Sequence, residues 1–193
     1  MRIRMALAGD APAVRAIYAP TIETTAISFE LTVPTVEEMA ERIIGRQPAH
    51  PWLVAERDGI VAGYAYAGRF SGRAAYDWSV ETSVYVDSAA RGSGVGRELY
   101  AALMALLEAQ GYRQAMAGIA LPNPASVALH ERAGFVPAGV YLAAGWKLGR
   151  WHDVGWWQRS LGDGLEVDRD PPAPPVPFTE LPPEVVRAAL GPG

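Results

Sequence analysis

The feature that most constrains this chain is a glycine-rich loop between a predicted strand and a predicted helix. Val84, Tyr85 and Val86 have the β-branched and aromatic side chains typical of a strand, and leucines recur at helical spacing from Leu99 to Leu107. Such a loop leaves several backbone N–H groups unpaired at the start of the helix, where the helix dipole also favours negative charge. The sequence therefore predicts an anion site, and phosphate is the ligand we expect.

The loop residues suit a phosphate group. Three glycines allow tight turns and a close approach of the backbone to a ligand, and two arginines add positive charge. The residues predicted to bind the phosphate group and the part of the ligand next to it are Val84, Tyr85, Val86, Arg91, Gly92, Ser93, Gly94, Val95, Gly96 and Arg97.

The spacing of the glycines separates three kinds of phosphate loop. A dinucleotide fingerprint, Gly-x-Gly-x-x-Gly, fits weakly, because its sixth position is Arg97 or Leu99. A nucleoside triphosphatase loop is excluded, since no Lys follows the glycines. The third pattern, Arg/Gln-x-x-Gly-x-Gly/Ala, is matched by residues 91–96. Six residues alone leave open a simple glycine-rich turn before an ordinary helix.

Composition limits what else the chain can do. With 193 residues, half of them hydrophobic, it suits one globular domain. It has no apolar run of membrane-spanning length and no signal-peptide pattern, so we expect a soluble, cytoplasmic protein. No cysteine is present, which excludes disulfides, thiolate metal sites and a cysteine nucleophile. The net charge of −4 argues against nucleic acid as a partner and favours a small anionic ligand.

The order of predicted elements indicates an α/β (α+β) fold. A strand at Ile3 is followed by helices capped at Asp10 and Thr35, the second ending at Gly45. Strands are predicted at 52–56, 60–70, 76–86, 112–119, 135–146 and 150–159, with a long helix ending at Gly111 and a short one at 124–133. These form a single domain over residues 1–161, with a mixed, mostly antiparallel sheet. Residues 162–193 hold half of the sixteen prolines and are predicted to be a tail with a short helix at 184–190.

A second motif makes a resemblance specific. The segment 123–135, Asn-Pro-Ala-Ser-Val-Ala-Leu-His-Glu-Arg-Ala-Gly-Phe, together with the glycine loop, resembles the two cofactor segments of the GNAT superfamily of N-acetyltransferases. Within it, the chain is similar to phosphinothricin acetyltransferases and their relatives that acetylate methionine sulfoximine and sulfone. That similarity is carried by residues 66–68, 75–78, 81, 123–127 and 149–155. Trp146, Trp156 and Ser71 depart from the pattern of the group.

The resemblance implies an activity and a set of roles. It implies acetyl-CoA as co-substrate, with Asn123 and Ser126 along its pantetheine arm, and direct transfer to the α-amine of a small amino-acid analogue. It implies Glu81 as general base and His130 as base or acid. It also implies a homodimer. His50 and His152 lack ligand spacing to His130, so we expect no metal site. The residues expected to hold the acceptor are Phe29, Arg73 and Tyr76. The alternatives are acetylation of another amine, such as a protein N-terminus or an aminoglycoside, and a non-catalytic acetyl-CoA sensor.

Overall fold

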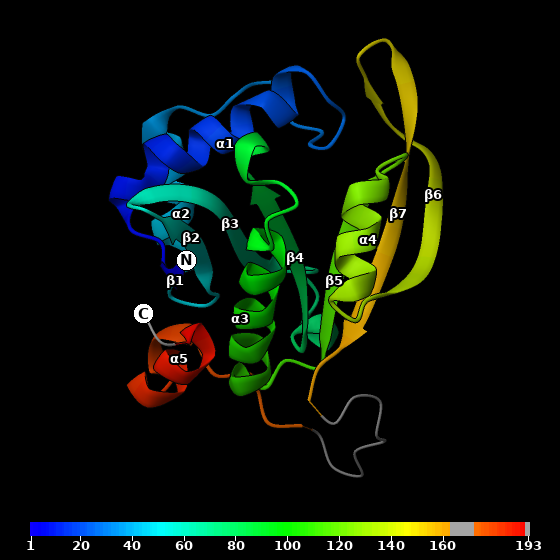
Figure 1. Ribbon diagram of the computed structural model, residues 1–193. Helices are drawn as coiled ribbons and strands as arrows, with labels where there is room; N and C mark the ends of the chain where they lie inside the picture. The colour runs from blue at the N-terminus through cyan, green and yellow to red at the C-terminus, as the bar shows by residue number, and fades with distance from the viewer. Residues whose placement is uncertain (163–171, 192–193) are drawn as a thin grey trace.

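A computed structural model describes residues 1–162 and 172–191, which form a seven-stranded sheet covered by helices on both faces (Figure 1). The sheet order is β1-β2-β3-β4-β5-β7-β6, and every neighbouring pair is antiparallel except β4 and β5. The strands are β1 (Arg2–Met5), β2 (Trp52–Arg57), β3 (Ile60–Arg69), β4 (Ser79–Val86), β5 (Gln114–Ala120), β6 (Val136–Lys147) and β7 (Arg150–Ser160). The helices are α1 (Ala11–Glu23), α2 (Val36–Arg46), α3 (Val95–Gln110), α4 (Pro124–Arg132) and α5 (Pro183–Leu190). The predicted mixed, mostly antiparallel fold is confirmed.

Each face of the sheet has its own apolar core. Leu99, Leu103 and Leu107 of α3 pack on one face, against alanines and valines of the central strands. On the other face, α1 and α2 cover the half formed by β1 to β4, where Val14 and Ile43 lie against Tyr64. The long helix therefore sits opposite α1 and α2, with the strand that leads into it between them.

Local signals fixed most element ends. The Thr35 hydroxyl accepts the Glu38 N–H at 3.1 Å and the Glu38 carboxylate accepts the Thr35 N–H at 2.7 Å, which is the predicted capping box. Asp58 and Gly59 both have positive φ, 52° and 78°, as a tight hairpin turn requires. Gly111 ends α3 in the left-handed conformation.

Two predicted boundaries were wrong, and one predicted cap is not made. Asp10 precedes α1, but its side chain makes no capping hydrogen bond to this helix, because its carboxylate accepts from the Leu7 N–H and from Arg4. α2 does not stop at Gly45 but includes Arg46, and its C-cap residue is right-handed, so no glycine is needed there. β4 starts at Ser79, because residues 74–76 form a 3-10 turn in which Tyr76 donates its N–H to the Arg73 carbonyl.

The C-terminal segment packs against the body of the molecule, and its predicted helix is confirmed as α5. Leu181 is 8% exposed and belongs to the core around α3. The buried Gln110 amide donates to the carbonyls of Ala49 and Val176, both at 2.8 Å, and so ties α3 to this segment. Residues 163–171 of the predicted tail, and its last two, lie outside the described residues. No helix within the described part of the chain is long and apolar enough to span a membrane.

Candidate active site

The glycine loop has the geometry of an open cradle for an anion. Gly92 and Gly94 have φ of 74° and 90°, and no atom lies within 4 Å of the place where a Cβ would stand on either. Gly94 is the N-cap of α3, so the first N–H groups of the helix point out beyond it. Gly96 has a different reason to be glycine, because a Cβ there would lie 2.9 Å from Leu129 of α4.

The two arginines near the glycine loop differ in whether their charge is already paired. Arg91 is exposed and has no ion-pair partner within the described segments, so its charge is available to a ligand. Arg97 instead pairs with Glu98 at 2.8 Å on the exposed surface. Ser93 donates its hydroxyl to the Ala90 carbonyl at 2.7 Å, which shapes the turn before the helix.

The centre of the sheet opens directly beneath this loop. β4 and β5 are paired only at Ser79–Gln114, Val80–Ala115 and Glu81–Met116, and then diverge (Figure 1). The Thr82 hydroxyl donates to the Met116 carbonyl at 3.1 Å and is the last tie between the two strands. Beyond this point, one edge of β4 faces the opening and is available to an extended ligand that starts at the glycine loop.

The register of β3 and β4 decides which side chains of β4 face each layer. Tyr64 lies opposite Tyr85, and Gly68 lies opposite Glu81, so Glu81 and Tyr85 share the face covered by α1 and α2. The rings of Tyr64 and Tyr85 stack there at 5.1 Å. Because side chains alternate along a strand, Thr82, Val84 and Val86 face α3.

Glu81 stands at the vertex of the opening, in the last paired position of β4. Its burial raises the pKa of the carboxyl group, and the charge of Arg46 on α2 lowers it in part. A raised pKa suits a carboxylate that must take a proton from an amine.

His130 lies on the opposite face from Glu81, buried between Tyr100 of α3 and Phe135 and 5% exposed. Its Nδ1 is 2.8 Å from the Ser126 carbonyl oxygen, which can only accept, so Nδ1 carries the proton. Its Nε2 then accepts from the Tyr100 hydroxyl at 2.7 Å. Burial lowers the pKa of His130, and the bond to the Ser126 carbonyl raises it in part.

The Tyr100 hydroxyl links His130 to α3. Burial raises the pKa of Tyr100, and the Thr82 side chain lowers it in part. Tyr100, His130 and Ser126 thus form one hydrogen-bonded chain from α3 to the first turn of α4. Asn123 caps that turn by accepting the Ser126 N–H at 3.2 Å.

The residues predicted to bind the acceptor substrate lie in two separate groups. Phe29 packs on Gly145 of β6, where a Cβ would collide with its ring, and lies 6.2 Å from the ring of His152. Tyr76 meets the ring of Phe70 at 5.6 Å, beside the exposed Arg73. No hydrogen bond, ion pair or ring contact joins Phe29 to Arg73 or Tyr76 in the part of the chain described.

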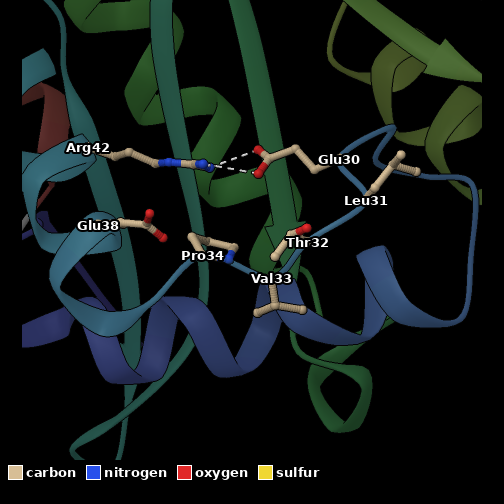
Figure 2. Close-up of a pocket in the computed structure, with 7 residues that line it drawn as sticks. All are labelled: Glu30, Leu31, Thr32, Val33, Pro34, Glu38 and Arg42. Atoms are coloured by element: carbon tan, nitrogen blue, oxygen red, sulfur yellow. Dashed lines mark hydrogen bonds and ion pairs between the residues drawn. The ribbon is translucent and has the colours of Figure 1, made fainter.

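The loop that carries Phe29 is fixed by an ion pair. Arg42 of α2 and Glu30 point toward each other beside a cavity of about 330 Å³, with hydrogen bonds of 2.8 and 3.0 Å (Figure 2). The Tyr18 hydroxyl donates to the same carboxylate at 2.9 Å. Arg42 and Glu30 are thus paired with each other, and the Glu38 carboxylate, which also lines the cavity, accepts the Thr35 N–H. We therefore place the candidate site at the open face of β4 and β5.

Sequence reasoning missed three features of the site. The rings of Phe70 and Trp156 meet at 6.0 Å and continue the aromatic surface beside Tyr76. In the sequence, Tyr100 looks like any other apolar residue of the long helix, so its contact with His130 was not predicted. Arg46 looks like an ordinary arginine at a helix end, so its electrostatic effect on Glu81 was not predicted. Strict alternation along β4 could have separated Glu81 from the α3 face, but nothing local identifies the partner of His130.

Comparisons with known proteins identify the family of the chain. Residues 3–156 match the family described as acetyltransferase (GNAT) domain. The phosphinothricin N-acetyltransferase of Streptomyces viridochromogenes is 45% identical over 177 residues, 92% of either chain. The L-methionine sulfoximine/L-methionine sulfone acetyltransferase of Salmonella typhimurium is 35% identical over 169 residues, 87% of this chain and 99% of the relative.

A solved structure is also similar over nearly its whole length. The GNAT superfamily phosphinothricin acetyltransferase from Sinorhizobium meliloti, in complex with AcCoA, has a TM-score of 0.80 and 36% identity, over 94% of this chain and 95% of its own. The resemblance first suggested by two short motifs thus extends over nearly the whole chain. The chain therefore belongs to the GNAT family of acetyltransferases.

Proposed function

We propose that the protein transfers the acetyl group of acetyl-CoA directly to the α-amine of a small amino-acid analogue, such as phosphinothricin or methionine sulfoximine or sulfone. The observation that carries this proposal is the opening between β4 and β5, with a glycine cradle at one end and Glu81 at its vertex. The names of the relatives that are 45% and 35% identical support the acceptor class.

The cofactor side of the opening is the face of α3 and α4. The backbone N–H groups around Gly92 and Gly94, with the charge of Arg91, would hold the pyrophosphate. The free edge of β4 from Val84 to Val86, with Asn123 and Ser126 opposite, would bind the pantetheine arm. Bound there, acetyl-CoA supplies an activated acyl group.

Glu81 would act as the general base from the face of β4 covered by α1 and α2, where the acceptor amine would bind. Its carboxylate takes a proton from the ammonium or the attacking amine, directly or through water, so that the nitrogen lone pair can form the new N–C bond as the C–S bond breaks. The departing sulfur leaves as a thiolate on the other face of β4. No covalent bond to the protein is needed.

His130 belongs to the leaving-group side in this proposal. Because β4 separates its ring from Glu81, the two residues would not compete for the same proton. The Nδ1 proton of His130 is engaged by the Ser126 carbonyl, and Nε2 accepts the Tyr100 hydroxyl proton. In the proposed leaving-group role, the Tyr100 hydroxyl would turn from Nε2 to donate to the sulfur as thiolate charge develops. Phe29, Arg73 and Tyr76 stay as proposed acceptor contacts.

A thiol-release assay over a panel of amines tests the proposal. We expect free CoA to appear with phosphinothricin, methionine sulfoximine or methionine sulfone. Turnover of N-terminal peptides or aminoglycosides, with none of the amino-acid analogues, would replace the proposed acceptor class. Tight acetyl-CoA binding without turnover on any amine would instead favour the non-catalytic sensor.

We also propose a homodimer, formed along the exposed edge of the sheet. β6 is an edge strand, and large apolar side chains on it and on the facing part of β7 are 51–76% exposed. They are Val140, Tyr141, Leu142, Trp146 and Trp151. Sedimentation should give a dimer mass, and Val140→Lys should reduce it while Ile60→Lys, at an exposed hairpin position, should not. A monomeric wild type would remove this proposal.

A further inference from the structure

Arg46, in the last turn of α2, is held in a defined position although it is exposed. Its guanidinium lies 4.8 Å from the ring centre of Tyr66 and 5.9 Å from that of Trp52. These two rings stack on each other, with their centres 4.3 Å apart and their planes at 18°. Cation–π contact with an aromatic ring orients an arginine and leaves its N–H groups free to donate.

The guanidinium lies beside Glu81. Gly68 is the residue directly opposite Glu81 on the neighbouring strand, and a side chain at Gly68 would collide with Arg46. Arg46 therefore occupies the place that a side chain of β3 would take on this face. Directly opposite Cβ atoms are about 4.5–5.5 Å apart, so the guanidinium stands one side-chain position from the proposed base.

Arg46 has no carboxylate partner among the residues that the structure describes. Arg42, one turn earlier on the same helix, is fully engaged by Glu30. Arg46 and Glu81 act on each other electrostatically but make no ion pair. A free guanidinium beside a carboxylate on an open face is suited to an anionic group that arrives with the acceptor.

We propose that Arg46 binds the carboxylate of the acceptor amino acid and so sets the preference for acceptors with an acid group next to the reactive amine. This rests on the proposed function. In an α-amino acid the amine and the carboxylate are attached to one carbon, so an arginine one side-chain position from Glu81 can hold the acid while the amine faces the base. The planar guanidinium offers two parallel N–H groups, which a carboxylate accepts in a bidentate pair. Arg73 is then free to contact the head group of the acceptor.

Amidation of the substrate tests the contact directly. We would measure kcat/KM for L-methionine sulfone and for its carboxamide, which lacks the negative charge, with the wild type and with Arg46→Gln. The wild type should lose about 10- to 100-fold on amidation, as expected for a charge-assisted pair. Arg46→Gln should lose less than about 3-fold, because the contact is already gone. Arg46→Lys should be intermediate, since it keeps the charge without the planar fork.

Arg187→Gln is the matched control, an exposed arginine in the last turn of α5. It should keep the full amidation penalty of the wild type. An equal penalty in the wild type and Arg46→Gln, or no penalty in an active wild type, would overturn the role of Arg46 and leave the proposed function intact. Turnover of peptides with neither methionine sulfone compound accepted would overturn the proposed function itself.

Discussion

Replacing Tyr100 with Phe removes one hydroxyl from the hydrogen-bonded chain that joins α3 to α4 through His130. Tyr100 is 1% exposed and its hydroxyl donates to His130 Nε2 at 2.7 Å, in a site where His130 is itself 5% exposed. The variant keeps the ring and its contacts with His130 and Phe135, so no large cavity forms. The main effect is a buried nitrogen acceptor left without a donor.

The free-energy cost of leaving His130 Nε2 without a donor sets the expected loss of stability. An unsatisfied buried polar group costs about 1–3 kcal/mol. For a chain of this length, each kcal/mol shifts Tm by about 2–4 °C, so Tyr100→Phe should melt about 2–12 °C below the wild type. Since the Tyr100 hydroxyl stabilises the neutral form of His130, its loss should also move the pKa of His130 upward.

Calorimetry and nitrogen NMR of the histidine ring together check this reasoning. We expect the lower Tm, an Nε2 chemical shift changed by loss of its donor, and slower CoA release. Tyr112→Phe is the control, because Tyr112 is buried but its hydroxyl has no hydrogen-bond partner within the described residues. A Tyr100→Phe protein with wild-type Tm and unchanged His130 shifts would show that this hydroxyl does not serve the imidazole.

Three further predictions concern the opening and its two sides. Glu81→Gln should lower turnover about 10²- to 10⁴-fold. Burial raises the pKa of Glu81 above its unfolded value, so the carboxylate destabilises the fold as pH rises through that range, and the variant should keep or increase Tm at neutral pH; a lowered Tm would indicate a structural role. The acid limb of the wild-type rate profile should lie above the usual glutamate pKa and disappear in the variant. Gly94→Val should weaken acetyl-CoA binding in calorimetry, because φ is 90° and the side chain would stand in the cradle; unchanged affinity would refute the loop assignment. Arg73→Ala should raise KM for the acceptor much more than for acetyl-CoA, and equal changes would point to a structural arginine.

Features set by a few neighbouring residues could be predicted from the sequence. The hairpin at Asp58-Gly59, the capping box at Thr35 and the glycine loop each depend on local backbone preferences, and the structure has each where the pattern indicated. The end of α2 was predicted one residue too early, because its C-cap residue, Gln47, is right-handed and the helix needs no glycine there.

The relation between the two proposed catalytic residues could not be predicted in the same way. A separation of 49 positions says nothing about which face of the sheet each side chain occupies. That depends on the pairing of Gly68 with Glu81 and on α4 lying on the α3 side, both of which are set by contacts distant in sequence. The position of Arg46 likewise needs the register of β3, since only a glycine opposite Glu81 leaves room for it.

The short junction between β4 and β5 has a mechanical consequence. Three parallel pairs and the Thr82 hydroxyl join β4 to β5, and the N–H groups of Arg113 and Gln114 add bonds to the Trp78 carbonyl just before β4. By contrast, β3 and β4 are paired at seven positions. Parallel pairing is also slightly weaker per residue than antiparallel pairing. We therefore expect the sheet to behave as two stiff plates joined by a narrow hinge, with α3 lying across the joint. The least stable part of the sheet then lies at the junction of β4 and β5, in the middle of the molecule. A ligand bound between the two strands would contact both halves of the sheet and stabilise their relative position.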